Sequence, residues 1–522
     1  MKLDTIIFLV YLVGLLVVGT YFTRKASKSV DQYLLGGRSL GPAVTALTMQ
    51  SSSMSGYMFM GGPALAFQQG WYALWYAFGD AGGAIVNLSV LGKRMRRMSE
   101  MLGALSPIEY LEKRFESPAI RIVGSVISII FLFGYVFAQF IASGKALEQL
   151  TGLSYSTALL IGVGVIISYT VTGGYLAVVW TDFIQGIIMV IGVVGIAIMG
   201  FIHLGGLSGL NEQIAAIDPS YLSPWGKDLA YIGQWGVVLG AVLIYSIGYM
   251  GLPHVVVRHM SMKSTKTVKG AILYAATWNQ LFVFTPYLLG FMAIVLLPEL
   301  NDPEMVIPTL AYEFFPGIMA AILLSAVMAA IMSTSDSILM QAGTILSRDI
   351  YLRFIDKKAS DNKMVNISRL CILAAGVIGV IVAVYQPPSV FSLVIFSFGV
   401  LGNSFIVPYV VSVYSKNANN IGVLCAMIFG GVTNIFWTSL ELQEATYLHP
   451  FLAGLIMSVL GMLVGNPFGK KPAWIEDIFP EVKKGYSVPA SLDKKVSRHL
   501  NLEAGNLGKY LKETQVGEDF SR

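Results

Sequence analysis

Long apolar stretches separated by short polar connections run along almost the whole chain. A membrane-spanning helix needs about 20 mostly apolar residues. Thirteen stretches meet this requirement, near 3–22, 41–67, 71–92, 119–143, 155–175, 181–203, 231–252, 270–298, 316–345, 367–386, 390–413, 420–438 and 447–466. The pattern predicts an all-α polytopic membrane protein with about thirteen transmembrane helices, and residues 1–470 form its membrane domain.

Basic residues concentrate in alternate connections between these stretches. If the N-terminus is outside, all but three of the 35 Lys and Arg residues fall on the cytoplasmic side, and the exceptions are Lys2, Lys145 and Lys227. Cytoplasmic connections of membrane proteins carry an excess of Lys and Arg. We therefore expect the N-terminus outside and the C-terminus inside. Residues 471–522 are polar and predict a short cytoplasmic tail.

Composition narrows the class of protein further. Apolar residues make up 55% of the chain and charged residues 12%, whereas soluble domains carry about 25% charged residues. Cys371 and Cys425 have neither the number nor the spacing of a disulfide framework or a metal site. The chain carries no nucleotide loop and no nucleophile–base motif, so we expect neither an enzyme nor a nucleic-acid partner. A passive channel and a transporter-like sensor remain alternatives.

Two of the predicted spans carry residues that interrupt helices. The second reads GPAVTALTMQSSSMSGYMFMGG (41–62), with four serines and paired glycines, and the seventh reads AVLIYSIGYMGLPH (241–254). Broken helices at corresponding positions of two repeats, here five spans apart, indicate an inverted-repeat transporter with a central binding site. The alternative is that these small residues only permit close helix packing.

The ninth span carries hydroxyl groups that suit a hard cation. Ala330, Ser333 and Thr334 are spaced to share one helix face. Together with main-chain carbonyls freed by the broken second span, two hydroxyls would form a neutral oxygen cage of the kind that hard cations prefer. In the alternative, both hydroxyls bond back to carbonyls of their own helix.

Ionisable residues within or beside the spans are candidates for function, because burying them in a membrane is costly. Asp336 lies on nearly the same face as the hydroxyl pair of the ninth span. Asp182 stands near the start of a span, where it either caps a helix or contacts an ion. Asp80 has no identifiable partner and is expected to face a water-filled vestibule. His254 and His259 are expected in a solvated or lipid-facing connection.

Four motifs, in this order and on these spans, resemble the sodium:solute symporter family. They are YLLGGRSLGP (33–42), WTDFIQG (180–186), GLPHVVVR (251–258) and AAIMSTSDS (329–337). The resemblance implies a leucine-transporter-type fold, with one extra N-terminal helix, two inverted five-helix repeats and two further C-terminal helices. It also implies sodium-coupled symport of a small organic solute by alternating access, in the plasma membrane (the inner membrane of bacteria). The oligomeric state stays open.

The resemblance also implies site residues. The family's sodium site corresponds to the carbonyls of Ser51, Met54 and Ala330 and the hydroxyls of Ser333 and Thr334. In some members a further sodium site exists, and here it would use Asp182, Asp336 and Ser337. The solute would lie between the broken spans, near Ser55, Gly56, Tyr245, Tyr249 and Pro253.

The motifs of this chain resemble those of two subfamilies that transport different solutes. GGRSLGPAVTAL (36–47) and the two tyrosines before Pro253 resemble sodium/proline symporters, whereas GLPHVVVR (251–258) and MVIPTL (305–310) resemble sodium/pantothenate symporters. Ser53 departs from the proline members, which carry Asp at that position. We expect an amino acid such as proline, with pantothenate or another monocarboxylate as the alternative.

Overall fold

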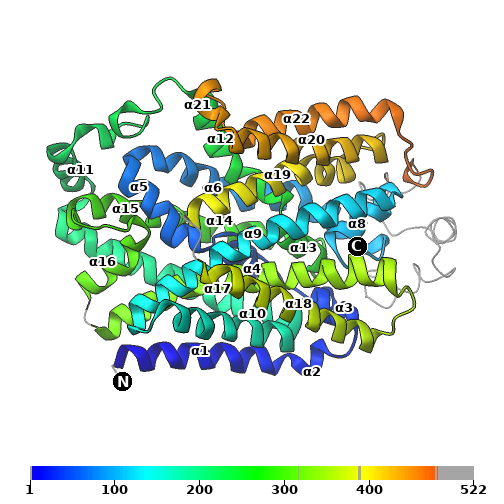
Figure 1. Ribbon diagram of the computed structural model, residues 1–522, viewed down its shortest axis with the longest axis horizontal. Coiled ribbons are helices and arrows are strands. Elements are labelled where there is room, and N and C mark those ends of the chain that lie inside the picture. Colours follow the sequence, from blue (N-terminus) through cyan, green and yellow to red (C-terminus); the bar gives the residue numbers. More distant parts are fainter. Residues whose placement is uncertain (1–2, 316, 386–389, 477–478, 480–522) are drawn as a thin grey trace.

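The computed structural model describes residues 3–315, 317–385, 390–476 and 479, and it is built from helices that pack side by side (Figure 1). Within these residues no β-strand is present, and nine helices are long and apolar enough to cross a membrane. The predicted all-α fold is confirmed. The count of thirteen crossings stays a prediction, because several of the predicted spans are made of shorter helices.

The first half of the chain contains the first broken span and the long helices packed around it. Its main helices are α1 (Leu3–Tyr21), α2 (Thr23–Ala26), α3 (Val30–Leu35), α4 (Pro42–Ser53), η2 (Tyr57–Gly61), α5 (Gly62–Gln69), α6 (Leu74–Asn87), α7 (Lys93–Met101), α8 (Pro107–Phe115), α9 (Pro118–Thr151), α10 (Tyr155–Leu204) and α11 (Gly206–Ile217).

The second half contains the second broken span and the C-terminal helices. Its main helices are α12 (Trp235–Ser246), η7 (Gly248–Gly251), α13 (Pro253–Ser261), α14 (Thr267–Phe282), α15 (Thr285–Leu296), α16 (Val306–Phe314), α17 (Gly317–Thr344), η9 (Ile345–Ile355), α18 (Asp361–Val384), α19 (Val390–Tyr414), α20 (Asn420–Ser439), α21 (Leu442–Thr446) and α22 (Pro450–Gly465).

Both predicted helix breaks are present. Helix α4 ends at Ser53, because Met54 leaves the helical region with φ −89° and ψ 80°. Helix α12 ends at Ser246, and Leu252 is extended before α13 begins. Pro253 suits the first position of α13, where its missing N–H would have no helical partner in any case. Each break leaves main-chain groups available at the centre of the bundle.

The two broken spans are joined to each other at one end. The amide of Leu40 donates to the carbonyl of Ser261 at 3.2 Å, and the amide of Lys263 donates to the carbonyl of Leu40 at 2.9 Å. The guanidinium of Arg38 adds a bond of 2.7 Å to the carbonyl of Met260. The start of α4 and the end of α13 therefore form one anchored unit.

Helix α10 is two helices in succession. A continuous helix of its 50 residues would be about 75 Å long, far more than the hydrocarbon thickness of about 30 Å. Gly174 interrupts it with φ 57° and ψ −154°. A Cβ atom at Gly174 would lie 2.8 Å from the ring of Tyr33, so only glycine suits the turn. The two stretches predicted at 155–175 and 181–203 are therefore separate helices.

Two regions that were predicted to be polar and exposed contain buried side chains. His254 and His259 do not lie in a solvated connection; both are fully buried in α13. That expectation was wrong because the helix resumes after Pro253 and carries the segment back into the core. Of the predicted tail, Trp474 is fully buried and donates to Glu116 beside α8 at 2.8 Å. Residues 477–478 and 480–522 lie outside the described part of the chain.

Candidate functional site

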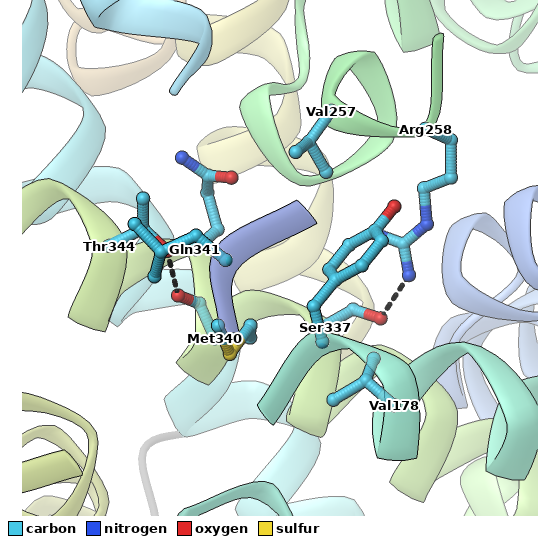
Figure 2. A pocket seen from close by; sticks show the side chains of 9 residues that line it. Val178, Val257, Arg258, Ser337, Met340, Gln341 and Thr344 are labelled. Atoms are coloured by element: carbon cyan, nitrogen blue, oxygen red, sulfur yellow. Dashed lines mark hydrogen bonds between the residues drawn. The ribbon is translucent and has the colours of Figure 1, made fainter. Parts of the chain in front are cut away.

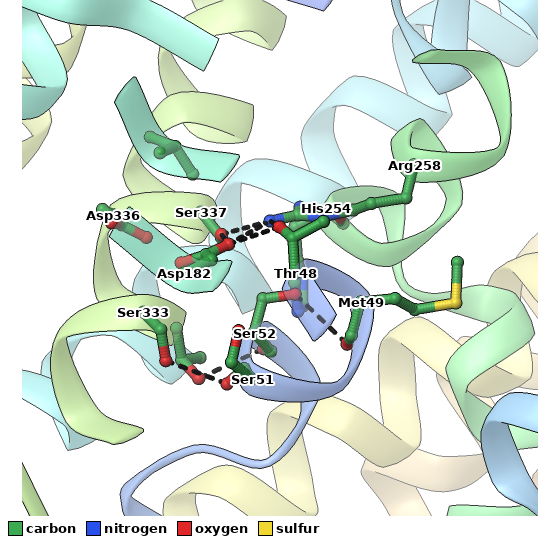
Figure 3. A network of polar contacts seen from close by, with 12 residues as sticks. Thr48, Met49, Ser51, Ser52, Asp182, His254, Arg258, Ser333, Asp336 and Ser337 are labelled. Atoms are coloured by element: carbon green, nitrogen blue, oxygen red, sulfur yellow. Dashed lines mark hydrogen bonds and ion pairs between the residues drawn. The ribbon is translucent and has the colours of Figure 1, made fainter. Parts of the chain in front are cut away.

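The hydroxyls of α17 meet the main chain of α4 where that helix ends. Ser333 Oγ donates to the carbonyl of Ser51 at 2.9 Å, and Thr334 Oγ1 donates to the carbonyl of Ser52 at 3.1 Å. Ser333 Oγ also lies 3.2 Å from the carbonyl of Ala330 in its own helix. All of these residues are fully buried, and Figure 3 shows the two contacts between helices. The hydroxyls thus bond across to α4 rather than only back to α17.

The tertiary structure brings together most of the predicted oxygen cage. Ser51, Ala330, Ser333 and Thr334 meet as expected, and Met54 lies buried just after the end of α4. The carbonyl of Ser52 is an addition that the sequence did not indicate. In a run of four serines, the spacing does not show which carbonyl faces α17; only the packing of α4 against α17 decides it.

A second polar cluster lies beside the cage and contains a buried ion pair. Arg258 Nη2 lies 3.0 Å from Asp182 Oδ2, and it also donates to Ser337 Oγ at 2.5 Å. Thr48 Oγ1 donates to the same carboxylate oxygen at 2.6 Å. Figure 3 shows this arrangement. Asp182 is thus not a helix cap: it lies two turns beyond Gly174, and its carboxylate faces other helices.

Asp336 lies on the other side of this cluster and has different partners. Tyr169 OH donates to Asp336 Oδ2 at 2.6 Å, and Thr181 Oγ1 lies 3.4 Å from the same oxygen. The residues predicted for a further sodium site therefore converge from α10 and α17, and a guanidinium from α13 already binds two of them. The sequence did not reveal this role of Arg258, because the residue falls in what resembles a basic connection.

A narrow cavity adjoins the bond between Arg258 and Ser337. It lies between α10, α13 and α17 (Figure 2), and its lining consists of Leu34, Tyr175, Val178, Val257, Arg258, Ser337, Met340, Gln341 and Thr344. The four lining residues that belong to α17, from Ser337 to Thr344, come after Ser333 and Thr334 in that helix. The cavity is too small to hold a water molecule, and it lies beside the part of α17 that follows the oxygen cage.

The predicted solute residues lie around the two helix breaks. The rings of Tyr57 and Tyr245 stack with centroids 4.7 Å apart, and Tyr249 lies beside them with its ring 6.0 Å from that of Tyr245. The amide of Gly56 donates to Gln139 Oε1 at 2.8 Å. Pro253 is buried at the start of α13. Tyr57 and Gln139 join the set only through the tertiary structure.

Asp80 does not face a water-filled vestibule. Its side chain is fully buried in α6, and its carboxylate accepts hydrogen bonds from Tyr57 OH and, at 2.5 Å, from Tyr249 OH. These two tyrosines come from the two broken spans. The expectation was wrong because the partners of Asp80 are distant in sequence, and a local sequence pattern does not predict them.

The fold and this site define a membrane transporter with a central site between two broken helices. The model of the sodium:solute symporter family matches residues 33–430, and the chain belongs to this family. It is a multi-pass membrane protein of the sodium-coupled solute symporter class.

Several characterised proteins are similar over most of their length. The osmoregulated proline transporter OpuE of Bacillus subtilis (strain 168) is 32% identical, over 91% of this chain and 96% of that protein. The high-affinity proline transporter PutP of the same organism is 33% identical, over 88% and 97% respectively. A sodium/proline symporter of Staphylococcus aureus (strain JH9) is 31% identical, over 91% and 94%.

Solved structures show the same fold. A Na⁺-coupled sialic acid symporter in a substrate-bound, outward-open state superposes with a TM-score of 0.74 at 21% identity, over 90% of this chain and 99% of that one. Mhp1, a transporter of the nucleobase-cation-symport-1 family, superposes with a TM-score of 0.54 at 15% identity, over 86% and 98%. The predicted arrangement of inverted repeats is therefore confirmed at the level of the fold.

Proposed function

We propose that this protein imports an amino acid, with proline as its solute, together with sodium. The observation that carries the proposal is the contact of two α17 hydroxyls, from Ser333 and Thr334, with carbonyls at the broken end of α4. The similarity to proline transporters over about nine-tenths of the chain supports the choice of solute. The N-terminus lies outside and the tail, residues 471–522, lies in the cytoplasm.

Sodium binds in the oxygen cage and ties α17 to α4. The ligands are the carbonyls of Ser51, Met54 and Ala330 and the hydroxyls of Ser333 and Thr334. In the present arrangement the hydroxyl protons point at carbonyl oxygens. Each hydroxyl must rotate so that a lone pair faces the ion, and it can do so because a hydroxyl has two acceptor lone pairs.

Closing α4 against α17 completes the solute pocket beside the break. The solute carboxylate binds at Ser55 and Gly56, where main-chain amides at the start of a half-helix favour an anion. It displaces the side-chain oxygen of Gln139, which holds the Gly56 amide in this structure. The rings of Tyr245 and Tyr249 supply an apolar wall with polar tips.

The ion leaves along α17 after the repeats rock against each other. The small cavity of Figure 2 lies beside the Arg258–Ser337 bond and the part of α17 that follows the cage, and it must widen before an ion can pass. A second sodium bound by Asp182, Asp336 and Ser337 would compete with Arg258 for two of these three residues. The geometry therefore supports one sodium in this conformation.

One sodium is sufficient to concentrate a neutral solute. A charge that falls through 100 mV releases about 2.3 kcal/mol, and a tenfold sodium gradient adds about 1.4 kcal/mol. Their sum supports an accumulation of several hundredfold. A monoanion such as pantothenate gains nothing from the voltage when it moves with one sodium, so a zwitterion fits a single-ion cycle better.

Uptake into proteoliposomes tests the proposal. Purified protein is reconstituted, and labelled proline or labelled pantothenate is supplied under an inward sodium gradient or with potassium in its place. We expect proline to accumulate only with sodium. Accumulation of pantothenate instead would overturn the solute, and uptake that never exceeds equilibrium would indicate a passive channel.

A further inference from the structure

A buried carboxylate lies between the two helix breaks and has no role in the proposed sodium cage. Asp80 in α6 accepts hydrogen bonds from Tyr57, just after the break in the first broken span, and from Tyr249, within the break of the second. Its own carbonyl accepts a bond of 3.0 Å from Asn279 Nδ2. The carboxylate is therefore fixed at the centre of the solute region from both sides.

The environment of Asp80 differs from that of two other buried acids, Asp182 and Asp349, and resembles that of Asp336, which also has neutral hydroxyl partners. Asp182 is paired with Arg258 at 3.0 Å, and Asp349 is paired with Arg121 at 2.9 Å. Among the residues that the structure describes, the side-chain partners of the Asp80 carboxylate are two neutral phenols. A charged group at membrane depth is costly unless a partner of opposite charge compensates it. A cation that comes from outside the chain would complete this site.

The polar groups around Asp80 also indicate a ligand. Tyr245 OH and Tyr287 OH have no hydrogen-bond partner although both side chains are fully buried. The ring of Tyr245 packs against the rings of Tyr57 and Tyr249, whose hydroxyls bind the Asp80 carboxylate. Buried polar groups normally have partners, so these hydroxyls fit a site that a polar ligand fills.

An aromatic path connects this site to a cavity of about 390 Å³ lined by Gly61, Lys145, Glu304 and Phe391, among others. The ring of Phe391 lies 6.0 Å from that of Tyr76, and Tyr76 lies 5.9 Å from Tyr245. These aromatic rings form a continuous series from the cavity to the tyrosines that bind Asp80. The cavity lies near the C-terminal end of α9, which we place on the extracellular side of the membrane.

We propose that Asp80 binds the protonated amine of the transported solute and selects zwitterions over anions. This inference rests on the proposed function and adds to it the recognition of the amine. The carboxylate end of the solute has a separate site at the Gly56 amide, where Gln139 Nε2 is also buried without a partner. Two sites of opposite character, one at the Gly56 amide and one at the carboxylate that binds the hydroxyl of Tyr57, match the two charges of an amino acid.

Competition in the wild-type protein separates the two charges of proline. Tetrahydrofuran-2-carboxylate keeps the ring and the carboxylate but has an ether oxygen in place of the amine. We expect it to inhibit labelled proline uptake with an affinity about 30-fold or more weaker than that of proline, because a buried charge left without its partner costs at least about 2 kcal/mol. Equal inhibition by proline and this analogue would overturn the proposal.

The isosteric variant Asp80→Asn tests the residue itself. We expect its half-saturating proline concentration to rise about 30-fold or more. The preference for proline over tetrahydrofuran-2-carboxylate should disappear, because the neutral amide of Asn can donate to the ether oxygen. The half-saturating sodium concentration should stay unchanged. If Asp80→Asn folds poorly, the wild-type competition alone decides.

The outcomes distinguish this proposal from the proposed function. If the wild-type protein accumulates no proline, the proposed function fails. If it accumulates proline and Asp80→Asn retains both the affinity and the preference, the role of Asp80 fails alone. A variant that loses sodium activation together with proline affinity would assign Asp80 to the ion and also overturn the amine site.

Discussion

Hydroxyl residues that are adjacent on α17 differ in the partners that their side chains contact. Ser333, Thr334 and Ser335 are consecutive hydroxyl residues on α17. Ser335 Oγ donates to Ile331 in its own helix at 2.7 Å, whereas Ser333 and Thr334 reach carbonyls of α4. The three residues are similar in chemistry, and only two of them are in a position to bind an ion between helices.

The double variant Ser333→Ala with Thr334→Ala should abolish the sodium dependence of proline uptake while the protein still folds. The cage loses both side-chain ligands, and the remaining carbonyls cannot hold sodium alone. Initial uptake rates across a sodium titration measure the effect. Ser335→Ala is the matched control and should titrate like the wild type; normal sodium activation in the double variant would remove the proposed cage.

The pair of Arg258 and Asp182 illustrates the cost of a buried charge. Arg258→Met should destabilise the protein by about 3–5 kcal/mol, because it leaves Asp182 buried without its cation. Adding Asp182→Asn should restore most of the loss. Thermal unfolding of the purified protein in detergent measures both effects, and losses that simply add in the double variant would show that the two residues do not act as a pair.

At the scale of helices, glycines set how closely the elements around the site approach one another. A Cβ atom at Gly79 of α6 would lie 2.2 Å from the carbonyl oxygen of Val242 in α12. Asp80 is the next residue in α6. Close packing of α6 against α12 therefore brings the carboxylate to the break that follows α12, and it does so only because position 79 lacks a side chain.

Gly79→Ala should lower the stability of the folded protein by about 1–3 kcal/mol, because backbone atoms must shift to make room for the methyl group. It should also weaken proline uptake by moving Asp80 away from Tyr249. Gly82→Ala, three residues further along the same helix, is the control, since nothing lies within 4 Å of its Cβ position. Equal behaviour of the two variants would contradict the close approach.

At the scale of the whole molecule, buried ion pairs connect the region of α8 to the end of the α17 segment. Glu109 in α8 pairs with Arg348 in η9 at 2.9 Å, and with Lys113 at 3.0 Å. Burial by itself would raise the pKa of Glu109, but the charges of Arg348, Lys113 and Arg121 outweigh it and hold this pKa well below its usual value. The pair of Glu109 and Arg348 joins segments that lie far apart in the sequence.

Glu109→Gln should destabilise the protein by about 2 kcal/mol, the typical loss of a charge-assisted hydrogen bond. Because the folded-state pKa is lowered, the stabilisation by Glu109 is fully present above the ordinary glutamate pKa of about 4.3 and is lost as the pH falls below that value. The difference from the wild type should therefore shrink below about pH 4. Thermal unfolding across this range measures it.

A matched control is Glu148→Gln, since Glu148 is exposed on α9. This variant should change stability little at any pH. A Glu109→Gln effect that stays undiminished as the pH falls from about 4 to 2 would contradict the loss of this stabilisation in acid.

Much of the architecture could be predicted from the sequence, because a membrane imposes strong local rules. Apolar length predicted the helical segments, and the serines, glycines and proline of the second and seventh spans predicted both breaks. The hydroxyl pair at Ser333 and Thr334 was predicted to meet freed carbonyls, and two such contacts are present. Each of these inferences depends on residues that are close together in the chain.

Only the tertiary structure decided which distant residues meet. It placed Arg258 on Asp182, enclosed His254 and His259 in the core, and paired Asp80 with two tyrosines. A basic or acidic residue near the end of an apolar stretch has the same local pattern whether it faces solvent or turns inward. The difference is set by the close packing of α4, α6, α10, α13 and α17, which depends on the whole chain.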